Sequence, residues 1–150
     1  TMHLSGPEGT REVAARDYYE AAYMTARGDE EILTALSFEA PEGGYAYEKQ
    51  KRKIGDYATA ACAALVTIEA GRCTHASIAM TNLADTPIWS PEASAALVGT
   101  ACDGAAVEAA VAAATAAIDP TEDNRGPVAF KMHVAGVIIR RAIERAISRA

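Results

Sequence analysis

Aromatic and basic side chains are concentrated in one short stretch of this 150-residue chain, residues 45–57, which reads YAYEKQKRKIGDY. Four of the 14 Lys and Arg residues fall within positions 49–53. If the stretch is a β-strand, alternation places one set of side chains on a shared face: Tyr45, Tyr47, Lys49, Lys51 and Lys53. Aromatic rings beside ammonium groups suit a planar, phosphate-bearing or electron-rich ligand, or an acidic protein surface. The alternative is an exposed edge strand whose lysines discourage edge-to-edge pairing.

Composition and charge exclude several classes of function. The formal net charge of -6 and the isoelectric point of about 5.0 argue against nucleic acid as the principal partner, because phosphate binding requires positive patches. Half of the residues are hydrophobic but only 6% are aromatic, so the core must consist largely of Ala, Val, Ile and Leu. The sequence contains neither a signal-peptide pattern nor an apolar run of transmembrane length.

Residues that bind metals or act as nucleophiles are few and scattered. Cys62, Cys73 and Cys102 form no CxxC pair, so we expect no disulfide framework and a reducing compartment, the cytoplasm. The histidines have no cysteine or carboxylate at ligand spacing, and no Ser/His/Asp constellation occurs. We therefore expect no metal site and no catalytic residue on this chain.

Residues 1–40 read as short elements separated by turns. The turn Gly6-Pro7-Glu8-Gly9 should separate two short strands, residues 2–4 and 12–14. A short helix should begin at Asp17, and a further strand should cover residues 32–38. Residues 41–44 (PEGG) have the composition of a connector and predict a domain boundary.

After the connector, strand patterns give way to helix patterns. Residues 58–69 and 73–81 read as strands that join the basic strand through tight turns. The β-branched run at residues 66–68 favours a strand in the first of them, although its alanines leave part of that segment ambiguous with a helix. Three helices follow, one between Ser90 and Gly99, one over residues 104–117 capped by Asp103, and one from Pro127 to the C-terminus. The last helix should bury one apolar stripe: Val134, Val137, Ile138, Ala142 and Ala146. The predicted fold class is α+β, with a small three-stranded antiparallel sheet followed by a three-helix bundle that covers one face of it.

Several segments resemble, in order, the FAD-binding medium subunits of molybdenum hydroxylases, and most of all those of aerobic carbon monoxide dehydrogenases. The segment YAYEKQKRKIGDYATAA (45–61) looks like the signature that opens the C-terminal domain of such subunits. Other segments that agree are SGPEGTREVAARDYYEAAYMTA (5–26), EEILTAL (30–36), THASIAMTNLADTPIW (74–89), LVGTACD (97–103) and RRAIERA (140–146). The likeness covers the whole chain but only the C-terminal half of such a subunit. It implies that residues 1–40 are the C-terminal tail of an α/β FAD-binding domain and residues 45–150 the C-terminal domain.

The resemblance implies an electron-transfer flavoprotein component of a molybdenum-containing oxidoreductase of the aerobic CO dehydrogenase type. Electrons would pass from [2Fe–2S] clusters on a small subunit through FAD to a quinone-type acceptor, and a large subunit would hold the molybdenum cofactor. The complex would be cytoplasmic or held peripherally at the inner membrane. The resemblance also implies three flavin contacts: Leu33 from the FAD-binding domain, Lys49 as a polar partner, and Tyr57 beside the isoalloxazine ring. A cation near the ring stabilises the negative charge that reduction adds.

The glycine-rich loops that hold the FAD pyrophosphate in this family, of the kinds AGGHS and TIGGN, do not occur here. The backbone amides of such loops cradle phosphate because no Cβ blocks the approach. We therefore expect a fragment or split half of a flavoprotein subunit, which shares FAD with a missing N-terminal half and does not hold it tightly alone. The alternative is a non-enzymatic binding or subunit-interaction module that does not bind flavin by itself.

Overall fold

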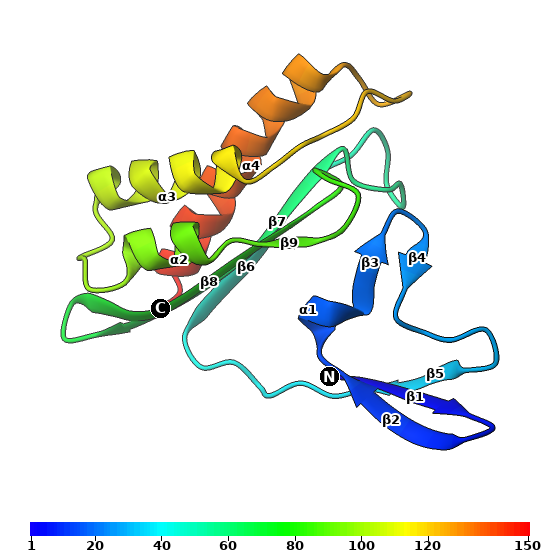
Figure 1. Ribbon diagram of the computed structural model, residues 1–150. Helices are drawn as coiled ribbons and strands as arrows, with labels where there is room; N and C mark the ends of the chain where they lie inside the picture. Colours follow the sequence, from blue (N-terminus) through cyan, green and yellow to red (C-terminus); the bar gives the residue numbers. More distant parts are fainter. The chain divides into compact units, whose positions relative to one another are not determined.

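The computed structural model describes all 150 residues, which form two compact units, Thr1–Pro41 and Glu42–Ala150. The fold is α+β, as predicted, and its sheets are small and antiparallel (Figure 1). The elements of the first unit are β1 (Met2–Gly6), β2 (Gly9–Val13), α1 (Ala15–Tyr18), β3 (Tyr19–Ala21), β4 (Met24–Thr25) and β5 (Ile32–Leu36). The elements of the second unit are β6 (Gly44–Gln50), β7 (Ala60–Glu69), β8 (Arg72–Thr81), β9 (Ile88–Trp89), α2 (Pro91–Leu97), α3 (Gly104–Ala116) and α4 (Val128–Ile147).

The first unit consists of a three-stranded sheet and a separate hairpin. Strand β1 lies between β2 and β5, and β3 pairs with β4. The prediction of a helix beginning at Asp17 is wrong, because α1 ends one residue later, at Tyr18, and a hairpin follows. Tyr23, between β3 and β4, has a φ of 61°, a left-handed conformation that a continuing helix does not allow.

The second unit is built on a four-stranded sheet in the order β6-β7-β8-β9. The three predicted strands are present, and the short strand β9 adds a fourth beside β8. Strands β7 and β8 are joined by a tight turn at Ala70 and Gly71, both with positive φ. The predicted tight turn between β6 and β7 is wrong, because residues 51–59 form a longer loop.

One face of this sheet is buried under helices, and alternation along the strands decides which face. The core-facing side chains are mostly small: Ala46, Cys62, Ala64, Val66, Ala76, Ile78 and Met80. Helix α4 packs on β6 and β7, helix α2 packs on β8, and α3 packs against both helices (Figure 1). Small core residues let the helices approach the sheet closely, but each contributes little buried apolar area.

The predicted helix signals at the N-termini are confirmed. The side-chain oxygens of Ser90 and Asp103 accept hydrogen bonds from the N–H groups of residues 93 and 106, and Pro127 directly precedes α4. The predicted stripe on α4 is partly wrong, since Val137 is exposed. Because α4 contacts α3 as well as the sheet, its buried face differs from the predicted stripe. The buried residues of α4 are Lys131, Ala135, Ile138, Ile139, Ala142, Ile143 and Ala146.

The beginning of β6 lies directly against the last turn of α4. A Cβ atom on Gly44 would collide with the carbonyl oxygen of Ala146, so only glycine allows this approach. Two arginines near this end of the chain hold the strand from the side, Arg145 in the last turn of α4 and Arg149 just after it. Arg145 pairs with the carboxylate of Glu48, and Arg149 donates a hydrogen bond of 2.8 Å to the carbonyl oxygen of Tyr45. Helix α4 thus fixes the position of the strand that carries the aromatic and basic residues.

Candidate functional site

An open pocket of about 380 Å³ lies in the second unit at the end of β6, bounded by the loop of residues 51–59 and the end of β8. It brings together two of the three predicted site residues, Lys49 and Tyr57. The full lining is Tyr47, Lys49, Gly55, Asp56, Tyr57, Ala58, Thr81 and Asn82.

The outward face of the sheet leads to this pocket. Tyr45 and Tyr47 are 64% and 58% exposed, and they alternate with buried residues along β6. In the register of the sheet, Lys49 lies beside Ala61, which in turn lies beside Thr81. Small residues in the central strand therefore leave space between the side chains of β6 and the end of β8.

The prediction that Lys51 and Lys53 continue this face is wrong. Strand β6 ends at Gln50, and the basic residues after it belong to the loop. The loop turns back where the N–H of Asp56 donates to the carbonyl oxygen of Lys53 at 3.2 Å, next to Gly55, whose φ of 82° favours glycine.

Asn82 closes this loop against the sheet. Its side-chain amide donates to the carbonyl oxygens of Ala58 and Thr59 at 2.6 and 3.2 Å. The N–H of Thr59 also donates to the carbonyl oxygen of Gln50 at 2.7 Å, so the two ends of the loop are tied together. Asn82 itself has a φ of 61°, a conformation that asparagine adopts more readily than most residues.

Lys49 is half-buried and is held by the loop. Its Nζ donates a hydrogen bond of 3.0 Å to the backbone carbonyl oxygen of Asp56. An ammonium group has three donors, so Lys49 can also donate to an acceptor placed in the pocket. The side chain thus combines a fixed position with a remaining capacity to bind.

Asp56 is the centre of the loop's polar contacts. One carboxylate oxygen, Oδ1, accepts from the N–H of Tyr57 at 2.8 Å and lies 3.5 Å from Arg125, while Oδ2 accepts from Nε of Arg52 at 3.1 Å. Burial raises the pKa of Asp56, but the hydrogen bonds from Arg52 and Tyr57 and the two guanidinium charges outweigh it. The net pKa of this carboxyl therefore lies below its ordinary value. Arg52 thus helps to hold the loop through its ion pair with Asp56.

Tyr57 presents its ring to solvent, with 81% of the residue exposed. The guanidinium carbon of Arg125 lies 5.6 Å from the ring centroid, within the range of a cation–π contact. Sequence reasoning missed Arg125 because it lies 69 residues from Asp56 and no local pattern connects the two. Asp56 lies within the segment 45–61 that resembles the family, but its contacts with Arg52 and Arg125 become visible only in the folded loop.

Leu33, the third predicted residue, lies in the first unit, on β5 opposite Leu4. It is 37% exposed, whereas Leu4 is fully buried. The pocket of the second unit does not include it. Its role as a flavin contact stays a prediction.

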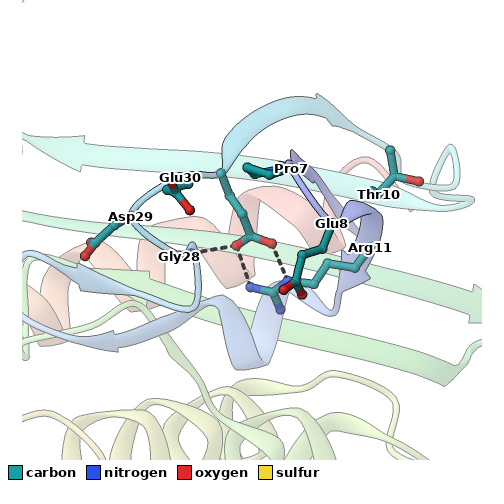
Figure 2. A pocket seen from close by; sticks show the side chains of 10 residues that line it. Pro7, Glu8, Thr10, Arg11, Gly28, Asp29 and Glu30 are labelled. Atoms are coloured by element: carbon teal, nitrogen blue, oxygen red, sulfur yellow. Dashed lines mark hydrogen bonds and ion pairs between the residues drawn. The ribbon is translucent and has the colours of Figure 1, made fainter.

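The first unit has an acidic pocket of about 520 Å³ between the β1–β2 turn and residues 28–31 (Figure 2). Glu8, Asp29 and Glu30 line it together with a closed ion pair, in which Nε of Arg11 contacts Glu31 at 2.6 Å. The hydrogen bond from Arg11, aided by the N–H of Gly28, lowers the pKa of Glu31 to about 2. Carboxylates dominate the lining, and the guanidinium of Arg11 is already paired with Glu31. This pocket therefore does not suit a phosphate group.

Other chemistry has little support in the structure. No group of three His, Cys, Asp or Glu side chains is placed to hold a metal ion. The three cysteines are buried, and burial raises the pKa of Cys62 to about 12 and that of Cys73 to about 11, so neither thiol ionises at neutral pH. None of the helices has both the length and the apolar character needed to cross a membrane.

The second unit matches a known family of domains. Residues 45–146 match the model of the CO dehydrogenase flavoprotein C-terminal domain. The chain belongs to this family. The match begins at Tyr45 and therefore includes the pocket residues of β6, the loop and β8.

Relatives extend the similarity to nearly the whole chain. The carbon monoxide dehydrogenase medium chain of Afipia carboxidovorans is 55% identical over 149 residues, covering 98% of this chain and 52% of the relative. The corresponding chain of Hydrogenophaga pseudoflava is 38% identical, covering 97% of this chain and 52% of the relative. In a solved structure of reconstituted CO dehydrogenase from Oligotropha carboxidovorans, one chain is 54% identical with a TM-score of 0.95. That alignment covers 99% of this chain and 53% of the solved chain. The chain thus spans about half the length of the relatives it matches.

Proposed function

We propose that this chain is part of the FAD-binding component of a molybdenum-containing oxidoreductase of the carbon monoxide dehydrogenase type. The observation that carries the proposal is the pocket of Lys49 and Tyr57, which lies within the matched flavoprotein domain. Residues 1–40 would be the tail of the FAD-binding domain, with Leu33 as its contact to the flavin. Membership of the family supports this function over that of an interaction module without flavin.

The residues of the pocket fit the ring system of a flavin better than its diphosphate. The exposed ring of Tyr57 offers an apolar face to a planar ligand. Lys49 and the side chains of Thr81 and Asn82 offer hydrogen-bonding groups at the edge of the pocket. The diphosphate would be held by another part of the protein, since no glycine-rich loop of the required kind occurs in this chain.

FAD, when bound, would accept electrons from an iron–sulfur centre and deliver them to an acceptor. The chain's own residues would prepare the site for that exchange. Lys49, held at the carbonyl oxygen of Asp56, would donate a hydrogen bond to a carbonyl oxygen of the ring and keep a positive charge beside it. Tyr57 would cover one face of the ring and exclude water. No residue of the chain makes or breaks a bond in the substrate.

The remaining parts of the proposal concern partners. The outward face of β6 and the loop would lie at an interface with the rest of the flavin component. A small subunit would supply [2Fe–2S] clusters, and a large subunit would supply the molybdenum cofactor and determine the substrate. The assembled complex would reside in the cytoplasm, or peripherally at the inner membrane if a membrane quinone is the acceptor.

Complementation tests the proposal. The purified chain alone should be colourless, and it should acquire stoichiometric FAD absorbance when combined with an FAD-domain half that carries both glycine-rich loops. A double variant, Lys49→Ala with Tyr57→Leu, should retain less FAD in the same assay, whereas Arg140→Met on α4 should behave like wild type. The proposal fails if the complemented wild-type chain binds no FAD. Addition of the other two subunits and CO should then bleach the flavin, and bleaching only by another substrate would contradict the CO dehydrogenase type.

A further inference from the structure

Arg125 occupies an unusual position for an arginine in a surface loop. It lies just before α4, yet only 15% of its side chain is exposed. The guanidinium contacts Asp56 at 3.5 Å and Asp123 at 3.8 Å, and it lies over the ring of Tyr57. One side chain therefore touches two of the loop residues that line the pocket, Asp56 and Tyr57.

A buried lysine anchors the segment that carries Arg125. Lys131, on the first turn of α4, is 2% exposed, and its Nζ contacts Asp123 at 2.9 Å and the carbonyl oxygen of Thr121 at 2.7 Å. Asp123 in turn accepts a hydrogen bond of 2.8 Å from the N–H of Arg125. A hydrogen bond from Lys131, followed by the contact with Arg125, holds the pKa of Asp123 below its ordinary value. A series of ion pairs thus connects the interior of α4 with the candidate site.

The contacts of Arg125 leave one polar atom without a partner. Its Nε is buried and makes no hydrogen bond within the chain. The other guanidinium atoms make the polar contacts, with Asp56 and Asp123. The guanidinium therefore meets the loop through the ring of Tyr57 and the carboxylate of Asp56.

We propose that Arg125 is a positioning residue for the flavin wall, which fixes the ring of Tyr57 and, through Asp56, the ammonium group of Lys49. The inference rests on the proposed function of this pocket. Arg125 covers one face of Tyr57 and so leaves the opposite face for the ligand. It also restrains Asp56, whose backbone carbonyl oxygen accepts the hydrogen bond from Lys49. A planar guanidinium suits this role better than an ammonium group, because it can stack on the ring while its N–H groups reach two carboxylates.

A double-mutant cycle in the FAD-containing assembly tests this role. Arg125→Met should weaken FAD binding by between about twofold and thirtyfold, the range expected from losing one cation–π contact. Arg125→Lys should recover part of that loss because it keeps the charge. The matched control is Arg140→Met, which removes the 2.6 Å ion pair between Arg140 on α4 and Glu108 on α3 and should leave FAD affinity unchanged.

Combination with Tyr57→Leu and Lys49→Ala separates positioning from general structural damage. If Arg125 acts through Tyr57 and, by way of Asp56, through Lys49, adding Arg125→Met to Tyr57→Leu with Lys49→Ala should cause little further loss of FAD affinity, whereas independent effects would add. Hydrogen exchange should also accelerate in residues 51–59 of Arg125→Met but not in α4. Additive losses, or unchanged exchange in the loop, would overturn the inference even if FAD binds. If Tyr57→Leu and Lys49→Ala leave FAD affinity unchanged, the proposed function of the pocket fails as well.

Discussion

The two units differ in how they are stabilised. In the first unit Leu4 and Tyr18 are the buried hydrophobic residues, and every side chain of β5 is exposed. Its cohesion comes from short hairpins and from polar contacts such as Arg11–Glu31. The second unit has a continuous core that includes three sheet strands and three helices. Since apolar burial is the main source of stability, the second unit should fold by itself and the first should depend on neighbouring parts of the protein.

The largest expected difference between the units is in hydrogen exchange. Amides of β1 and β5 should exchange at least on the order of a hundredfold faster than those of β7 and α4, because strands with few buried apolar contacts open locally. Limited proteolysis should likewise cut residues 1–31 first. Slow exchange throughout residues 1–31 with fast exchange in residues 130–147 would contradict the division into a dependent and a self-sufficient unit.

Matched truncations in the two units should sharpen the contrast. Ile139 on α4 is fully buried, and Ile139→Ala should lower the free energy of unfolding by about 2–5 kcal/mol. Ile32 on β5 is 69% exposed, and Ile32→Ala should change the free energy of unfolding by less than about 0.5 kcal/mol. Urea unfolding followed by circular dichroism measures both. Equal losses would mean that β5 packs in a core of its own.

A smaller effect concerns the pH dependence of the first unit. The pKa of Glu31 is lowered to about 2 from an ordinary value of 4.5, so its contribution to stability is complete above about pH 4.5. That contribution should disappear as the pH falls through about 2. An NMR titration of the Glu31 carboxyl checks this, and Arg11→Met should move the midpoint upward. A midpoint that stays the same in the variant would show that Arg11 is not the cause.

The elements that the sequence predicted correctly are those with local signals. Caps at Ser90 and Asp103 and the β-branched run in β7 defined helices and strands of the second unit. The wrong predictions concern segments whose structure depends on contacts between residues far apart in the sequence. Lys51 and Lys53 continued the alternation of β6 in the sequence, but Gly55 and the closure by Asn82 turn the chain away.

The same distinction applies to the candidate site. Lys49 and Tyr57 could be found because they lie within one recognisable segment, and the structure brings them to one pocket. Arg125 could not be found, because its connection to Asp56 depends on how the segment before α4 packs against the loop. The exposure of Val137 was missed for a similar reason, since the position of α3 shifts the buried face of α4.

The most direct test of the central claim, that the pocket of the second unit forms a wall of a flavin site, is the reduction potential of FAD in the assembled protein. Lys49→Ala removes the cation beside the ring and should lower the two-electron potential by roughly 20 mV, which corresponds to about 1 kcal/mol. Redox titration of wild type, Lys49→Ala and the control Arg140→Met measures this. A lowered potential in Lys49→Ala alone, with normal FAD content, is the predicted result. An unchanged potential at normal FAD content would contradict it.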